Sequence, residues 1–508
     1  MRKIRSAALA IAITAPFLQM PSTGAVDDIN TTRLRDAVTV GGMLGHERVF
    51  QRIANNNEGT RASGTRGYKQ SANYVERTLT NAGYTVRTQE FTFPFFRNVS
   101  PAELQQLTPT PTDYETDTFE YSGSGEVIGQ VVPTNDVMVP PGAEPSSSNS
   151  GCEPGDFTPA STTEDQVALI QRGTCFFEDK ARNAEAAGYD AVIIFNEGQE
   201  GRTDLLTGTL SVPFDIPVVG LSFADGAALY EATQDGPVTV RVFTDTQTNL
   251  AATTKNVIAS LPGGNNDKVV LAGGHLDSVA DGPGINDNGS GTATLLEIAE
   301  QMAELDIHTR QKLRFAFWGA EESGLHGSTN YVNELSNAQL GRVKAYLNFD
   351  MVGSPNYVRF VFDGNGSDLE PAGPPGSAQI ERIFNRYFSS QDLESDPTPL
   401  GGTSDYAPFM DVGIPIGGIF TGATGIKTEE QAEVYGGTAG EAYDSCYHEA
   451  CDRVDRLNTK ALSEMSDAAA HGIMTLAKTK SGFFEDGSLR VGQRVVVKPG
   501  ARFGQVSR

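Results

Sequence analysis

The stretch Gln311–Gly327, QKLRFAFWGAEESGLHG, joins a buried-strand pattern to two adjacent acids. Its first eight residues are mostly apolar and β-forming, and Glu321 and Glu322 follow almost at once. Adjacent like charges after a buried segment are costly unless a cation lies nearby. The stretch therefore predicts a strand whose carboxyl end presents acids to a positive partner.

Similar apolar runs recur along the second half of the chain. They are DKVVLAGGH (267–275), GRVKAYLNFDM (341–351) and IPIGGIF (414–420), and GTATLLEIAEQMAEL (291–305) has the spacing of an amphipathic helix. Strand-like runs alternating with helical segments are typical of α/β folds. We predict a mixed, mostly parallel central sheet with helices on both faces.

The chain of 508 residues is long enough for two domains and tails. Basic residues, an apolar run and small residues before Ala25 predict a signal peptide over 1–25. We expect a main domain formed by 30–128 and 249–481, interrupted by a smaller α/β domain over 129–248. The Pro- and Ser-rich VPPGAEPSSSNSG (139–151) lies near the start of that insert. Residues 482–508 form a tail of unknown role.

The formal net charge of −25 argues against binding to nucleic acid or to an anionic membrane. No stretch after the signal peptide is apolar enough to span a bilayer, so we expect a secreted, soluble protein, with a monomer favoured. Its four cysteines, Cys152, Cys175, Cys446 and Cys451, predict two disulfides with three connectivities open.

Acidic and imidazole side chains follow three successive predicted strands. His275 and Asp277 end the first, Glu321 and Glu322 the second, and Asp350 the third. Functional groups gather outside the carboxyl ends of strands in open α/β sheets. A single histidine is usually structural, and we expect this of His46, His308, His326 and His471. The concurrence of acidic and imidazole side chains at the ends of three strands nevertheless predicts a site.

Two loops complete the predicted site. GINDNGSG (284–291) carries Asp287, and CYHEACD (446–452) presents His448 beside Tyr447. Histidine and carboxylate ligands without cysteine suit zinc, or else cobalt or manganese. Five ligands fit two metal ions bridged by one carboxylate; they are His275, Asp287, Glu322, Asp350 and His448.

The remaining polar residues then have predicted roles in hydrolysis. Glu321 stays off the metals. The metals lower the pKa of bound water, and Glu321 then accepts the water proton as general base and returns it as general acid. Asp277 orients the His275 imidazole, and Tyr447 donates a hydrogen bond to the developing oxyanion. No Gly-x-Ser-x-Gly motif supports a serine hydrolase.

The sequence resembles the secreted co-catalytic zinc aminopeptidases of the bacterial leucyl aminopeptidase type, especially the streptomycete form. The resemblance rests on GGHLDSV, GINDNGSG, FAFWGAEESGLHGS, YLNFDMVGSPN, SDYAPF, GGIFTGA, GGTAGEAYDSCYHEACD and SDAAAHGIMTLA. It covers nearly all of 35–95 and 250–480, and it implies removal of N-terminal residues, commonly large apolar ones, from peptides and proteins.

The resemblance also assigns residues. It implies two Zn²⁺ held by the five ligands above with Asp287 bridging, Glu321 as acid/base, Tyr447 as transition-state donor and a Cys446–Cys451 disulfide. Glu321 and Asp350 would hold the substrate ammonium. Residues 130–245 resemble a protease-associated domain, acting either as a modulating lid or as a passive, stabilising module.

Two positions differ from the resembled family. Its calcium site near the N-terminus would use Asp28, Ile29 and Asp467, but Ser463 replaces one acid. Thr403 replaces a substrate-contacting arginine, so side-chain preference could shift.

Three rival functions remain for comparison. A carboxypeptidase or dipeptidase needs a basic residue for the substrate carboxylate, and GGTSDY (401–406) offers none. A cyclase of N-terminal glutamine needs only one zinc, so the presence of all five predicted ligands disfavours it. A non-catalytic binding protein would have lost Glu321 or a ligand, and neither is lost.

Overall fold

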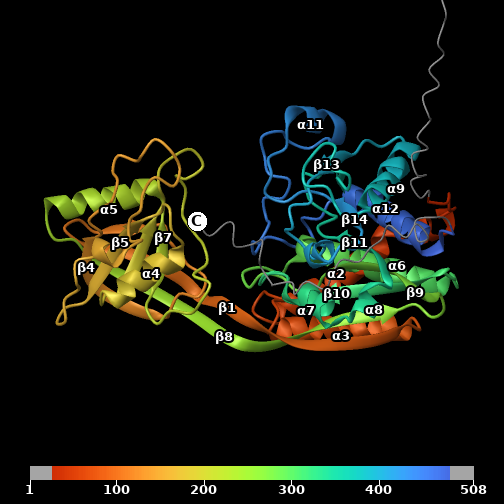
Figure 1. Ribbon diagram of the computed structural model, residues 1–508, viewed down its shortest axis with the longest axis horizontal. Helices are drawn as coiled ribbons and strands as arrows, with labels where there is room; N and C mark the ends of the chain where they lie inside the picture. Colours follow the sequence, from red (N-terminus) through yellow and green to blue (C-terminus); the bar gives the residue numbers. More distant parts are fainter. Residues whose placement is uncertain (1–25, 481–508) are drawn as a thin grey trace, which may run out of the picture.

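The computed structural model describes residues 26–480. The predicted signal peptide and the tail at 482–508 lie outside the described residues. The described chain forms two lobes, joined by the long strands β1 (Thr85–Thr108) and β8 (Thr239–Ser260), which run through both (Figure 1). Over the described residues, no helix has the length and apolar character to cross a membrane.

One mixed sheet runs through both lobes. Its main path has the order β13-β12-β14-β11-β9-β10-β8-β4-β5-β6-β7-β3, with β1 paired to β8 and β2 to β1. The strands of the larger lobe are β9 (Asn265–His275), β10 (Gln311–Trp318), β11 (Val343–Phe349), β12 (Phe360–Phe362), β13 (Asp396–Thr398) and β14 (Ile416–Phe420). Strands β10, β9, β11 and β14 are parallel neighbours, as the sequence predicts.

Helices cover both faces of the larger lobe's sheet, as predicted. Val270 and Ala272 of β9 pack into one apolar core with α2, α3, α6, α9 and α12, whereas Leu271 between them packs into another with α7 and α10. Alternate strand residues thus reach opposite cores, because side chains alternate across a strand. The helices of this lobe are α1 (Thr32–Arg35), α2 (Val40–Asn55), α3 (Arg66–Asn81), α6 (Gly291–Glu304), α7 (His326–Glu334), α8 (Asn337–Leu340), α9 (Ser377–Ser390), α10 (Ala407–Asp411), α11 (Glu429–Tyr435) and α12 (Thr459–Lys478).

The smaller lobe repeats the strand-to-helix pattern predicted for the insert. Its elements are β2 (Thr112–Tyr114), β3 (Asp117–Thr118), β4 (Gly125–Pro133), η1 (Pro154–Asp156), β5 (Gln166–Gln171), α4 (Phe177–Ala186), β6 (Ala191–Phe195), β7 (Val218–Leu221) and α5 (Phe223–Asp235). The strands β4, β5, β6 and β7 are parallel in that order and bury apolar cores on both faces.

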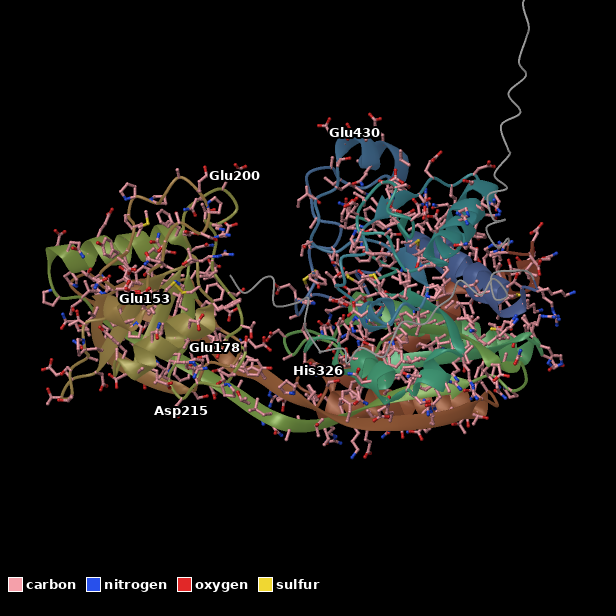
Figure 2. The ribbon with its side chains drawn as sticks, in the orientation of Figure 1. Glu153, Glu178, Glu200, Asp215, His326 and Glu430 are labelled. Atoms are coloured by element: carbon pink, nitrogen blue, oxygen red, sulfur yellow. A yellow bond between two sulfur atoms is a disulfide. The ribbon has the colours of Figure 1, made fainter. Side chains whose placement is uncertain are left out.

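Acidic side chains are spread over the outside of both lobes. Glu153, Glu200 and Asp215 of the smaller lobe are exposed, and Glu430 lies on α11 at the top of the larger lobe in Figure 2. The surface therefore carries the strongly negative charge that the composition indicates.

Candidate metal centre

The parallel strands β9, β10 and β11 bring three predicted ligand segments to one edge of the sheet. His275 is the last residue of β9, Asp350 follows β11 directly, and Glu321 and Glu322 follow β10 after two residues. Strand β9 lies between the other two and is parallel to both. Their carboxyl ends therefore meet, as the sequence predicts.

Asp287 lies between the two predicted imidazole ligands. Its Oδ1 is 3.1 Å from His275 Nε2, and its Oδ2 is 3.2 Å from His448 Nε2. His275 Nε2 is also 3.3 Å from Asp350 Oδ1, and His448 Nε2 is 3.1 Å from Glu322 Oε2. The five predicted ligands thus form two adjoining groups that share the Asp287 carboxylate.

Unusual backbone conformations lie beside these ligands. Ala320 (φ 52°) precedes Glu321, Met351 (φ 52°) follows Asp350, and His448 itself has φ 62°. Positive φ is uncommon for residues other than glycine and often marks functional sites. The surrounding structure thus holds the backbone where these side chains can converge.

The electrostatics of the cluster are dominated by buried acids. Burial raises the pKa of Glu321 well above its ordinary value, and it raises the pKa of Asp277 to about 7. Burial acts to lower the pKa of His448, but Glu322 and Asp287 outweigh it and raise this pKa to about 11. For His275, Glu321 and Asp350 likewise outweigh burial and raise its pKa well above the ordinary value. The acids therefore strongly favour positive charge at their centre.

The residues present fit divalent metal ions. Glu322 Oε1 is buried without a hydrogen-bond partner in the described structure. No lysine or arginine is among the described residues that line the cavity at this site. An imidazole and carboxylate donor set without cysteine suits zinc. The geometry, the unsatisfied oxygen and the concentration of acids all favour cations at this position.

The two predicted assisting residues lie next to the cluster. The nearest acceptor to His275 Nδ1 is the backbone carbonyl of Asp277, at 3.2 Å, and the Asp277 carboxylate is 3.9 Å from the same nitrogen. That carboxylate also accepts a hydrogen bond from the Glu321 backbone amide. Tyr447 stacks on the His448 ring at a centroid distance of 3.8 Å. Asp277 therefore contacts both the imidazole segment and the Glu321 segment.

A cavity of about 380 Å³ opens onto the cluster. Its lining includes the predicted ligands, Glu321 and Tyr447, together with the apolar side chains of Met351, Phe362 and Phe420. Small cavities of this kind, apolar with a few polar groups at one end, suit the binding of small molecules or chain ends.

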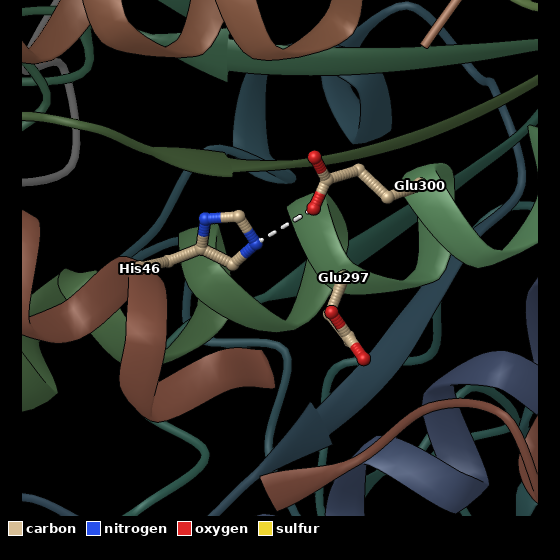
Figure 3. A group of neighbouring side chains, drawn as sticks. All are labelled: His46, Glu297 and Glu300. Carbon is tan, nitrogen blue, oxygen red and sulfur yellow. Dashed lines mark ion pairs between the residues drawn. The ribbon is translucent and has the colours of Figure 1, made fainter. Parts of the chain in front are cut away.

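A third group of metal-type side chains, between α2 and α6, has a structural explanation (Figure 3). His46 Nδ1 lies 2.7 Å from the Tyr74 hydroxyl, and its Nε2 lies 3.1 Å from Glu300. Glu297 accepts hydrogen bonds from the amide and hydroxyl of Thr39, at the start of α2. His46 thus links helices, in agreement with the structural role expected for it.

His326 lies close to the acid pair in sequence but packs elsewhere. Its ring lies 6.1 Å from that of Phe93, and burial lowers its pKa to about 4. This histidine is therefore neutral and part of the packing between α7 and β1.

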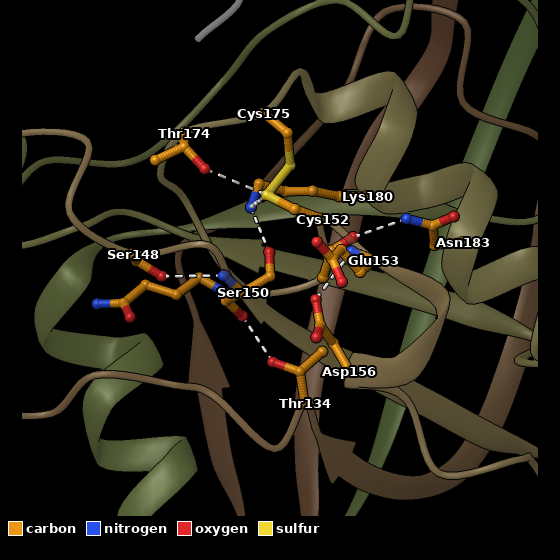
Figure 4. The surroundings of a disulfide bond; sticks show 12 residues. Thr134, Ser148, Ser150, Cys152, Glu153, Asp156, Thr174, Cys175, Lys180 and Asn183 are labelled. Carbon is orange, nitrogen blue, oxygen red and sulfur yellow. Dashed lines mark hydrogen bonds between the residues drawn. A yellow bond between two sulfur atoms is a disulfide. The ribbon is translucent and has the colours of Figure 1, made fainter.

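The structure contains two disulfides. Cys446 pairs with Cys451 around the Tyr447–His448 turn, and Cys152 pairs with Cys175 in the smaller lobe (Figure 4). Lys180 is buried beside the second disulfide, donates to the Ser150 carbonyl and lies 3.7 Å from Cys152 Sγ.

The chain is similar to several known proteins. The profile of peptidase family M28 matches residues 256–473, and that of the PA domain matches residues 127–229. An aminopeptidase of Pseudomonas aeruginosa is 47% identical over 430 residues, which cover 82% of this chain and 77% of that protein. The chain belongs to peptidase family M28.

Two further relatives extend the match. A probable leucine aminopeptidase 2 of Aspergillus fumigatus is 39% identical over 423 residues, covering 83% of this chain and 80% of that protein. The solved aminopeptidase of Aneurinibacillus sp. strain AM-1 is 25% identical with a TM-score of 0.66, covering 89% of this chain and 97% of that one. This M28 chain is therefore a peptidase with the zinc-exopeptidase type of fold and an inserted PA domain.

Sequence reasoning assigned no role to several residues at the M28 site. Ser404 donates a 2.6 Å hydrogen bond to Asp350 Oδ2 and accepts one from Asn348. The adjacent Asp405 is fully buried, and burial raises its pKa to about 8. Both residues belong to GGTSDY, in which only Thr403 was singled out from the sequence. A short polar loop has no hydrophobic periodicity from which the contacts of its residues could be predicted.

The predicted calcium site stays a prediction. Arg35 lies close enough to Asp467 to lower the pKa of this acid, although burial raises that pKa to about 6 overall. Among residues 26–480, neither Asp28 nor Asp467 belongs to a group of three metal-type side chains.

Proposed function

We propose that this M28 peptidase is a secreted aminopeptidase that uses two zinc ions to remove N-terminal residues from peptides and proteins. The observation that carries the proposal is the Asp287 carboxylate, which faces the His275 imidazole with one oxygen and the His448 imidazole with the other. The activity named for the Pseudomonas relative supports it.

The proposed zinc sites share Asp287. His275 and Asp350 would complete one site, and His448 and Glu322 the other, since these pairs lie on opposite sides of the shared carboxylate. When bound, the metals supply positive charge for the substrate carbonyl and make a water molecule acidic enough to lose its proton near neutral pH.

Glu321 moves the proton in the proposed reaction. Its side chain is buried at the cavity wall, with a carboxylate oxygen within 4.8 Å of ligand atoms of His275 and Asp350, and Asp277 accepts from its backbone amide. A carboxylate oxygen of Glu321 accepts a proton from the attacking water and later returns it to the leaving amine. The high proton affinity that burial gives this acid favours the first of these transfers.

Tyr447 and the acids orient the substrate. The Tyr447 hydroxyl donates to the carbonyl oxygen as negative charge develops there, because burial raises its pKa and keeps it protonated. Glu321 and Asp350 hold the free α-ammonium. No arginine or lysine is among the described lining residues, so no basic side chain there would pair with a substrate carboxylate, which disfavours a carboxypeptidase.

The apolar residues in the cavity lining indicate which side chain the first residue of the substrate carries. Met351, Phe362 and Phe420 would contact that side chain, and burial of an apolar side chain against them stabilises binding by about 2 kcal/mol. We therefore propose a preference for leucine and similar residues, in line with the name of the Aspergillus relative.

We also propose a division of the chain into domains. We place the peptidase domain at 30–128 and 249–481 and the inserted protease-associated domain at 129–248, close to the profile matches at 256–473 and 127–229. The smaller lobe itself begins before this boundary, since β2 and β3 lie in it at 112–118.

Mass spectrometry of a leucine-initiated peptide and its N-acetylated twin tests the activity. We expect stepwise loss of residues from the free peptide only, abolished by chelation and restored by zinc. Cleavage of the acetylated peptide, or trimming from the C-terminus, would contradict the proposal.

A further inference from the structure

A fully buried arginine lies beneath the proposed metal centre. Arg61, between α2 and α3, has 0% exposure. Its Nη1 donates to the Leu276 carbonyl at 2.5 Å, its Nε to the Pro283 carbonyl at 2.8 Å, and its Nη2 to the Gly284 carbonyl. Leu276 follows His275, and Gly284 precedes the turn that carries Asp287. One side chain therefore connects the backbones of two predicted ligands.

The residues around Arg61 extend this connection. The Arg61 amide donates to Ser278 Oγ at 2.9 Å, and Thr60 Oγ1 donates to the Val279 carbonyl at 2.8 Å. Ser63 Oγ accepts a 2.7 Å bond from the amide of Ala320, which precedes Glu321. The stretch Thr60–Ser63 thus contacts the ends of both β9 and β10.

Two buried acids lie near the Arg61 guanidinium. Glu47 on α2 is fully buried, and neither of its carboxylate oxygens has a hydrogen-bond partner in the described structure. Asp452 accepts from the amides of Asn286 at 2.7 Å and Asp287 at 3.1 Å. Both acids lie within electrostatic reach of the guanidinium. The turn carrying Asp287 is therefore fixed by Arg61 on one side and by Asp452 on the other.

We propose that Arg61 is a positioning residue for the metal centre, an inference that rests on the proposed two-zinc function. Its guanidinium holds the end of β9 and the 283–284 segment at a fixed separation, which places His275 Nε2 3.1 Å from Asp287 Oδ1. A planar fork of donors can reach three carbonyls at once, which the compact ammonium of lysine cannot do in the same geometry.

The test compares Arg61→Lys with a matched control, Arg359→Lys, in the full chain. Arg359 is also buried, donates to the Glu394 carbonyl and pairs with Glu464, but it is not among the residues that line the metal cavity. Zinc affinity of the chelator-stripped proteins is measured by competition with a fluorescent chelator. The visible spectrum after Co²⁺ loading reports the ligand geometry, and the melting temperature without metal reports the fold.

We expect both variants to lose thermal stability without metal, but only Arg61→Lys to lose zinc affinity, by about 10- to 100-fold as for other residues that orient metal ligands. Its Co²⁺ spectrum should also differ from wild type. Wild-type zinc affinity and Co²⁺ spectrum in Arg61→Lys, with only the melting temperature lowered, would overturn the proposal.

A milder variant serves if Arg61→Lys does not fold. Ser278→Ala removes the acceptor of the Arg61 amide and the donor to the Gly282 carbonyl, and it deletes no acceptor of the guanidinium. Losing these hydrogen bonds should weaken zinc binding by about fivefold or more, and unchanged affinity would count against the proposal. Wild-type protein that binds no zinc or releases no N-terminal residue would instead refute the proposed function itself.

Discussion

Removing the Cys446–Cys451 disulfide should impair the metal site more than it impairs stability. The two cysteines are 5 residues apart, and the entropy of closing so short a loop corresponds to about 2 kcal/mol of stability. The Cys152–Cys175 pair spans 23 residues, and the same relation gives about 3.4 kcal/mol. We therefore expect C446S/C451S to be the more stable double variant and the less active one.

The effect on the site follows from how His448 is held. Its side chain is 40% exposed, far more than the other predicted ligands, and its φ of 62° is unfavourable for an open loop. Without the disulfide, zinc binding must itself fix the backbone of His448. Fixing one residue costs about 1–2 kcal/mol, which is equivalent to a loss of about 5- to 30-fold in zinc affinity. C152S/C175S should leave that affinity unchanged.

Urea unfolding, zinc competition and hydrolysis of a leucyl chromogenic substrate measure these effects. Trp318 is the single tryptophan and is fully buried in the larger lobe, so its fluorescence reports unfolding there, while circular dichroism reports both lobes. Wild-type zinc affinity in C446S/C451S would refute the reasoning. So would a greater loss of stability in C446S/C451S than in C152S/C175S.

Three further predictions concern single side chains. Glu321→Gln should lower kcat by about 10²- to 10⁴-fold with two zinc ions still bound; loss of zinc by metal analysis would instead make Glu321 a ligand. Phe420→Ala should lower kcat/KM about tenfold more for leucyl than for alanyl substrates; equal losses would remove Phe420 from the specificity pocket. Burial lowers the pKa of Lys180 to about 8 from its ordinary 10.5, so the unfolded chain binds more protons between these values and stability should rise with pH there. The unfolding free energy of wild type relative to Lys180→Met should therefore increase from pH 8 to 10, and a flat difference would contradict the burial argument.

Local sequence patterns were sufficient to predict the sheet edge of the site. His275, Glu322 and Asp350 follow apolar runs, and parallel pairing of β9, β10 and β11 brings these run ends together. The direction of the strands alone decides which ends meet, so no knowledge of side-chain contacts was needed. Asp287 was predictable because glycines mark its turn.

Contacts between distant segments could not be predicted in this way. Arg61 bonds Gly284, which is 223 positions away, and nothing in GTRAS (59–63) distinguishes a buried arginine from an exposed one. Strand β8 was not predicted from the sequence, for a related reason. Its central residues, such as Asn249 and Leu250, are exposed and show no apolar alternation, and pairing with β1 makes them a strand.

The candidate site therefore has two halves that are held by different physical means. His275, Glu322 and Asp350 are fixed by the sheet, whose topology any chain with this fold reproduces. Asp287 and His448 lie on loops that buried polar contacts hold together, since Asn286 donates to Asp444 at 2.6 Å and Asp452 accepts from the amides of Asn286 and Asp287. Asp444 and Asp452 flank the disulfide loop, so a shift of His448 is transmitted to the shared carboxylate of Asp287. The half built on loops is consequently where a substitution can alter the metal centre while the fold remains intact.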